Sequence, residues 1–171
     1  LSLNPNGKIP AIIDPNGPGG QPLAVFESGA ILLYLADRFG ALLPRSGPDR
    51  TEVLNWLFWL QASAPFIGGG FGHFYAYAPF AQEYPINRYA METKRLLDVA
   101  DQRLGQVPYL GGQDYSIADI AAWPWLGGLM NNDTYGAARF LGVDAYRNLR
   151  DWTGRIAARE AVRRGKVVNT R

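Results

Sequence analysis

The sequence of 171 residues contains no cysteine. Structural disulfides and thiolate metal sites are therefore excluded within it, and any sulfur chemistry must come from a ligand or from residues outside this sequence. His73 is the only histidine, so a histidine metal cluster is excluded as well, and we expect no metal. No apolar run approaches the roughly 20 residues of a membrane span, and no signal-peptide pattern is present. We therefore expect a cytoplasmic protein without a membrane partner.

Net charge is also low, at +2, but the basic residues gather near the C-terminus. The region from residue 147 onward holds Arg147, Arg150, Arg155, Arg159, Arg163, Arg164, Lys166 and Arg171, against Asp151 and Glu160. A solvated helix face is the simpler interpretation. Nucleic-acid binding through this tail is an alternative that we disfavour, and it would be salt-sensitive.

The most informative stretch runs from Asn4 to Ala36. Two short apolar runs separated by a wide Gly/Pro-rich turn, then an apolar helix starting near Ser28, predict a β-β-α unit. The bond before Pro10 is a candidate cis peptide that would leave the Ile9 backbone free to pair with an extended ligand. The helix start favours a carboxylate, and Glu27 could take an ammonium group. An ordinary hairpin with a capped helix is the alternative.

The remainder predicts helices. Residues 42–48 are typical of a linker, and Asp49 with Glu52 resembles a capping box that starts a long helix, apolar nearly all round except at Asn55. Residues 64–79 mix four glycines with aromatics, so we expect either close helix contacts or a backbone that meets a ligand. His73 lies there, as a core residue or a site residue.

Later signals are mostly structural. Pro85 precedes an amphipathic helix that ends at Gly105, with Arg88 expected in its first turn, where the helix dipole disfavours a cation. Ser116 and Asp119 form a capping box to which we assign no catalytic part. Pro124 should kink the helix that follows, and Asp144 is predicted to cap a last long helix.

Several segments together resemble one family. Residues 4–12 (NPNGKIPAI) and 26–35 (FESGAILLYL) look like the second half of the thioredoxin-like domain of a glutathione transferase. Residues 55–59 (NWLFW), 68–75 (GGGFGHFY) and 115–119 (YSIAD) narrow the likeness to the bacterial nu-class enzymes, the glutathione-dependent disulfide-bond reductases. The likeness covers essentially the whole chain.

The resemblance implies a mostly α fold. A partial thioredoxin-like β-β-α unit (residues 1–41) and a linker (42–48) would precede an all-α glutathione transferase C-terminal domain (49–171). It also implies that an upstream β-α-β unit, which carries the thiol-activating residue of these enzymes, precedes this sequence; hence no catalytic residue is assigned. We further expect a homodimer.

The resemblance also implies a glutathione-dependent disulfide reductase or transferase, with glutathione as cosubstrate and a small disulfide or electrophile as partner. The glutathione-binding residues it implies are Lys8, Ile9, Pro10, Glu27, Ser28, Asn55 and Arg88. Candidates for a second site are Phe71, His73 and Tyr77. The alternative is a non-catalytic, glutathione-transferase-like assembly module.

Overall fold

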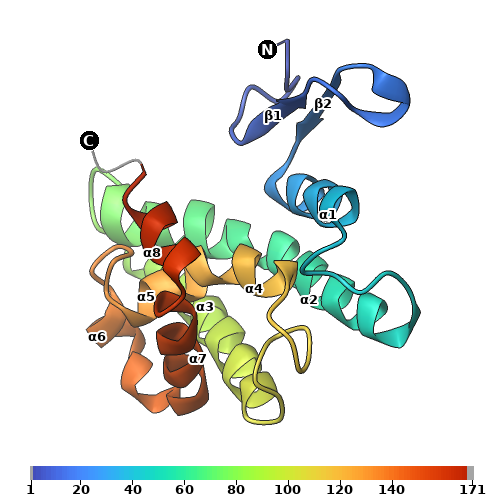
Figure 1. Cartoon of the computed structure of the whole chain (residues 1–171). Helices are drawn as coiled ribbons and strands as arrows, with labels where there is room; N and C mark the ends of the chain where they lie inside the picture. The colour runs from blue at the N-terminus through green and yellow to red at the C-terminus, as the bar shows by residue number, and fades with distance from the viewer. Residues whose placement is uncertain (1, 169–171) are drawn as a thin grey trace.

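The described part of the chain has a β-hairpin near its start, and helices follow it (Figure 1). The computed structural model describes residues 2–168. Strands β1 (Ala11–Asp14) and β2 (Leu23–Phe26) form a two-stranded antiparallel sheet. The wide turn between them contains a short 3-10 helix, η1 (Pro18–Gly20), which confirms that the connection is longer than a tight hairpin turn.

The register of the sheet determines which residues flanking the two strands lie close together. Ala11 pairs with Phe26, and Asp14 pairs with Leu23. Because the strands are antiparallel, the residues just before Ala11 and those just after Phe26 lie at the same end of the hairpin. That end leads directly into helix α1 (Ser28–Phe39). Gly40, in a left-handed conformation with φ of 62°, ends α1 as its position in the sequence predicted.

A linker joins α1 to the long helix α2 (Gly47–Pro65). The linker packs on the helical part of the chain: Leu43 is buried, and the carbonyl of Leu42 accepts a hydrogen bond from the Ile117 amide at 3.0 Å. The prediction that α2 starts at Asp49 was wrong by two residues. Pro48 fits the first turn of a helix, where its missing N–H is no loss, so Asp49 lies within that turn rather than capping it.

Helix α2 continues without a break into η2 (Phe66–Tyr77), which has π-helical geometry. The glycines of η2 explain its packing. A Cβ atom built on Gly70 would overlap Cδ1 of Tyr89, and one on Gly72 would overlap Cζ of Tyr135. Gly69 has open space around it. Close helix contact, one of the two uses predicted for these glycines, is therefore confirmed at Gly70, whereas Gly72 lies against Tyr135 in the loop between α5 and α6.

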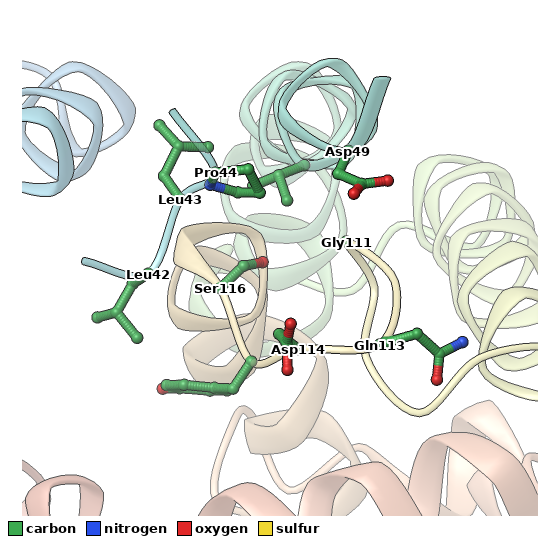
Figure 2. A pocket seen from close by; sticks show the side chains of 10 residues that line it. Leu42, Leu43, Pro44, Asp49, Gly111, Gln113, Asp114 and Ser116 are labelled. Atoms are coloured by element: carbon green, nitrogen blue, oxygen red, sulfur yellow. The ribbon is translucent and has the colours of Figure 1, made fainter. Parts of the chain in front are cut away.

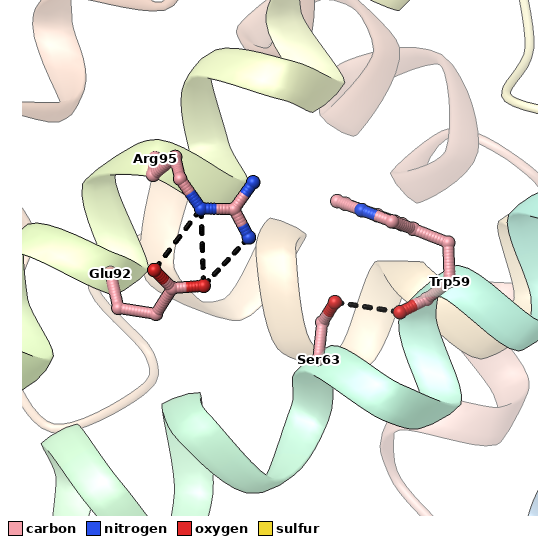
Figure 3. Close-up of polar contacts among 4 residues, drawn as sticks. All are labelled: Trp59, Ser63, Glu92 and Arg95. Carbon is pink, nitrogen blue, oxygen red and sulfur yellow. Dashed lines mark hydrogen bonds and ion pairs between the residues drawn. The ribbon is translucent and has the colours of Figure 1, made fainter.

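Helix α3 (Glu83–Leu104) packs along η2 and ends at Gly105, as predicted. Figure 3 shows polar pairs of α2 and α3, each lying within one helix: Ser63 donates to the carbonyl of Trp59 at 2.6 Å, and Arg95 pairs with Glu92 at 2.6 Å. Because α3 begins at Glu83, its sixth residue, Arg88, lies in the second turn. The expectation of Arg88 in the first turn was therefore wrong.

The remaining elements are short. They are α4 (Ile117–Ala122), η3 (Trp123–Gly127), α5 (Gly128–Met130), α6 (Ala138–Leu141), η4 (Val143–Ala145), α7 (Arg147–Ala157) and α8 (Glu160–Lys166). Helix α4 gives way to the π-helical η3 at Trp123, next to Pro124, so the helical geometry changes where a kink was predicted. Asp144 does not cap α7; it lies in η4 and pairs with Arg150 at 2.5 Å.

The core lies among α2, η2, α3, α4 and α7, with Trp152 of α7 fully buried. Its polar centre is Asp119, which accepts hydrogen bonds from the Trp152 indole at 2.8 Å and from the amides of Leu110 and Ser116. The capping box is thus confirmed. Helices in residues 2–168 are too short or too polar to cross a membrane. Of the basic tail, Arg171 lies outside the described residues.

Candidate functional site

The hairpin end nearest α1 collects most of the residues that the sequence singles out. Ile9 and Pro10 precede β1, and Glu27 and Ser28 follow β2, so the register places the two pairs side by side. The Ile9–Pro10 peptide bond is cis, as predicted. The Ile9 side chain is 95% exposed, although it is apolar. Two features expected from separate parts of the sequence therefore meet at one end of the hairpin.

Asn4 fixes the turn that presents Lys8, Ile9 and Pro10. Its buried side chain donates to the carbonyl of Lys8 at 2.8 Å and accepts from the amide of Asn6 at 2.8 Å. Such contacts between an asparagine and its own neighbouring backbone hold a turn in place. Lys8 itself is exposed beside this turn.

Glu27 has a backbone conformation that few residues other than glycine adopt, with φ of 69° and ψ of 125°. Such conformations cluster at binding sites, because the surrounding structure must hold them in place. The first hydrogen bond of α1 runs from the Ile31 amide to the Glu27 carbonyl at 2.9 Å. The amides of residues 28–30 therefore lie outside the hydrogen-bond ladder of the helix, and the start of α1 is suited to an anion.

Ser28 contacts a residue that sequence reasoning missed. Its hydroxyl donates to Oε1 of Gln61 on α2, at 3.3 Å. The Gln61 side chain also lies against Gly29, where a Cβ atom would approach its Cγ to 2.9 Å. The sequence did offer a signal, because Gln61 is polar within an apolar stretch of α2, as Asn55 is.

Asn55 lies elsewhere on α2. Six residues at about 100° each place it roughly 120° around the helix from Gln61, and its side chain is exposed. A contact between Asn55 and a ligand at the hairpin end of the same chain gains no support from this placement. Arg88 is also exposed, one turn before Glu92. The hydrogen bond from Arg95, with a smaller contribution from the Arg88 charge, holds the pKa of the Glu92 carboxyl below its usual value. The roles of Asn55 and Arg88 stay predictions.

The three second-site candidates divide into two groups. Phe71 has no exposed surface and stacks on Tyr75, with ring centroids 4.9 Å apart. A ligand cannot reach its ring in this arrangement, so the structure assigns Phe71 to the core. His73 is exposed, edge-on to Phe74, and Tyr77 is 71% exposed. At about 1.5 Å per residue, His73 lies on the order of 25 Å from Asn55 along α2 and η2, too far for one small ligand.

A separate pocket of about 360 Å³ lies between the linker, the start of α2 and the loop before α4 (Figure 2). Leu42, Leu43 and Pro44 line one side of it, with Asp49, Gln113 and Asp114 around the rest. It shares no residue with the hairpin end. Within residues 2–168, no group of three or more His, Asp or Glu side chains is placed to hold a metal ion.

Comparison with known proteins gives two family matches. Residues 1–37 match the N-terminal domain of glutathione S-transferases, and residues 83–155 match their C-terminal domain. The chain is 52% identical over 169 residues to the disulfide-bond oxidoreductase YghU of Escherichia coli, covering 99% of this chain and 58% of that protein. It is 43% identical to the disulfide-bond oxidoreductase YfcG of the same organism, covering 94% of this chain and 72% of that protein. The chain thus spans less than two thirds of the length of YghU.

A solved structure is also closely similar. A glutathione transferase family member from Pseudomonas fluorescens, crystallised with two glutathione molecules bound, superposes with a TM-score of 0.91 at 43% sequence identity. The match covers 96% of this chain and 73% of that one. The similarity therefore includes both the hairpin with α1 and the helices that follow.

Proposed function

Since the chain belongs to the glutathione transferase family, we propose that it binds glutathione at the hairpin end and serves in a glutathione-dependent disulfide reductase. The observation that carries the proposal is the juxtaposition of the cis Ile9–Pro10 peptide with Glu27 and Ser28. Glutathione is a tripeptide with a backbone, two carboxylates and one amine. These groups match the exposed backbone, the helix start and the glutamate at the hairpin end.

Each of these groups of glutathione has a chemically suited partner at the hairpin end. The Ile9 backbone pairs with the cysteinyl part of glutathione as a strand pairs with an extended peptide. The start of α1 and the Ser28 hydroxyl take the carboxylate of the γ-glutamyl end, and Glu27 takes its ammonium group. Lys8, exposed beside the turn, assists the other carboxylate.

The chemistry needs no cysteine from the protein. The thiolate of bound glutathione attacks one sulfur of a small disulfide; a new S–S bond forms, and the other sulfur leaves as a thiolate that takes up a proton. A second glutathione thiolate then attacks the glutathione sulfur of the mixed disulfide, which gives glutathione disulfide and a second free thiol. Across both steps the substrate disulfide is reduced and two glutathione molecules are oxidised. The similar protein from Pseudomonas fluorescens holds two glutathione molecules, which supports this scheme.

The second molecule would be bound by exposed residues among those singled out in the sequence. Arg88, His73 and Tyr77 are exposed, and an arginine is suited to a carboxylate because it forms charge-assisted hydrogen bonds. We also propose a cytoplasmic location, because reducing compartments keep glutathione in its thiol form.

We further propose that the protein is a homodimer. Phe58 is 59% exposed and Phe66 41% exposed, and they lie eight residues apart on α2 and η2 with the exposed Ala62 between them. Residues at this spacing lie along one side of a helix. The apolar stripe they form is suited to cover by a second copy.

Glutathione binding measured by calorimetry on the wild-type chain and its variants tests the proposal. We expect Glu27→Ala and Ser28→Ala each to weaken binding by about ten-fold or more, since each removes a charge-assisted hydrogen bond. Glu83→Ala, which alters an exposed glutamate at the start of α3, is the matched control and should bind as the wild type does.

Disulfide reduction by the complete enzyme that contains this chain, with and without the same substitutions and followed with a small aliphatic disulfide and glutathione, separates the reductase from an assembly module. An assembly module would show no glutathione binding in the wild type and no change in either variant. That result would overturn the proposal.

A further inference from the structure

The contact between Ser28 and Gln61 joins two parts of the chain that lie on opposite sides of the linker. Ser28 opens α1, next to the hairpin, whereas Gln61 lies on α2, beyond the linker. Their side chains meet at 3.3 Å. Gly29 makes this contact possible, because a Cβ atom at that position would press on Cγ and Cδ of Gln61 at 2.9 and 3.0 Å. The amide of Gln61 is therefore held beside the start of α1.

The direction of the hydrogen bond determines what Ser28 can offer to a ligand. A hydroxyl has one proton to donate and two lone pairs to accept with. When Oε1 of Gln61 faces Ser28, the proton is used on Gln61 and only lone pairs remain. When the amide turns over, its NH₂ group donates to the hydroxyl oxygen, and the serine proton becomes available to an acceptor. The two orientations of a glutamine amide have nearly the same shape, so the exchange needs no other movement.

We propose that Gln61 is a positioning residue for Ser28: its side-chain amide holds the hydroxyl in place and, by turning over, directs the serine proton to a carboxylate of glutathione. This inference rests on the proposed function, because it concerns the γ-glutamyl carboxylate expected at the start of α1. Asn55, on another side of α2, does not take this part. Gln61 itself need not touch the ligand.

A double-mutant cycle tests whether Gln61 acts through Ser28. Calorimetric titration with reduced glutathione compares the wild type, Gln61→Met, Ser28→Ala and the double variant. Methionine keeps most of the packing on Gly29 but can form neither hydrogen bond. We expect Gln61→Met to weaken binding by about five-fold in the wild type and by less than about two-fold when Ser28 is alanine. Gln106→Met, at an exposed site after α3, is the control.

A second variant separates the hydrogen bond from packing. Glutamate at position 61 has the shape of glutamine but, when ionised, can only accept. We expect Gln61→Glu to bind glutathione more weakly than Gln61→Met at neutral pH. The difference should narrow as the pH falls towards about 4.3, the ordinary pKa of a glutamate, because the protonated side chain can again donate. Thermal unfolding of every variant shows that each is folded at the temperature used.

The outcomes are distinguishable. Equal effects of Gln61→Met in both Ser28 backgrounds would mean that Gln61 acts independently of Ser28, which overturns the inference and leaves glutathione binding intact. Wild-type affinity in Gln61→Glu at all pH values would overturn it as well, because packing alone would then be sufficient. Absence of glutathione binding by the wild type would overturn the proposed function, and this inference with it.

Discussion

Single residues at the hairpin end combine local constraint with exposure. Glu27 keeps a positive φ of 69° that glycine would adopt more readily, and Ile9 exposes an apolar side chain. Neither feature stabilises the fold, so a role in function explains both of them better than a role in stability. At the far end of β1, Asp14 has the opposite character. Its carboxylate accepts from the Tyr34 hydroxyl at 2.7 Å and from the Asn16 amide at 2.9 Å, and Arg38 lies 3.0 Å away.

Asp14 should make stability depend on pH in the acid range. The Tyr34 hydrogen bond, then the Asn16 amide and the Arg38 charge, hold the pKa of the Asp14 carboxyl below its usual value. A lowered pKa in the folded state means that the stabilisation is present above the unfolded pKa of about 3.9 and is lost as pH falls through the folded pKa. We expect Asp14→Asn to lose less stability than the wild type between about pH 5 and pH 2.5.

Urea unfolding midpoints measured across that pH range provide the comparison. Asp151→Asn, at an exposed position on α7, serves as the control and should keep the pH dependence of the wild type. If Asp14→Asn also kept it unchanged, the contacts around Asp14 would not contribute to acid stability.

Among the elements, η2 shows most clearly how individual glycines are related to the packing of neighbouring side chains. Helix α3 lies along η2, and Tyr89 of α3 stacks on Phe74 with ring planes 11° apart. Gly70 leaves room for the Tyr89 ring, whereas Gly69, one residue earlier, faces open space. Two neighbouring glycines of the same helix therefore have different uses.

Alanine at these two positions should have opposite effects. We expect Gly70→Ala to lower the free energy of unfolding by about 1–3 kcal/mol, because the new methyl group overlaps Tyr89. Gly69→Ala should raise it by up to about 1 kcal/mol, because alanine favours a helix and meets nothing. Chemical denaturation of both variants and the wild type measures the difference. A similar loss in both would show that helical geometry, rather than the Tyr89 contact, requires glycine.

For the whole molecule, the long α2–η2 rod is central to the packing, because α1 and α4 contact α2 and α3 contacts η2. One side of it packs in the core through Leu57, Leu60 and Ile67, and Gln61 faces the start of α1. The stripe through Phe58 and Phe66 remains exposed in a single copy. A helix that is apolar nearly all round is expected to be buried on more than one side. Within the chain this burial is only partial, and the homodimer would account for the rest.

A charge in this stripe should separate the subunits. We expect Phe58→Asp to shift the protein from dimer to monomer at micromolar concentration, since burying an unpaired carboxylate in an apolar interface is strongly unfavourable. Light scattering coupled to size-exclusion chromatography measures the mass. Phe39→Asp, at another exposed phenylalanine near the end of α1, is the matched control. A wild type that is itself monomeric would contradict the proposed dimer.

Local signals in the sequence determined many features directly. Gly40 ends α1, Ser116 and Asp119 form their capping box, and the bond before Pro10 is cis. Each of these features depends on residues within a few positions of one another. The local sequence is therefore sufficient to predict it. The helix boundaries near Asp49 and Asp144 were less well predicted, because several nearby residues can start a helix and packing decides among them.

Only the tertiary structure decided which distant residues meet. The register of the hairpin brought Ile9 beside Glu27, the fold buried Phe71, and α2 placed Gln61 rather than Asn55 against Ser28. Ser28 and Gln61 are 33 positions apart. At that separation a sequence shows that a polar residue interrupts an apolar face, but the rotation and packing of the helix determine what it contacts. The sequence alone therefore determined the family and the local form of the hairpin end, and the fold decided which of the candidate residues lie together there.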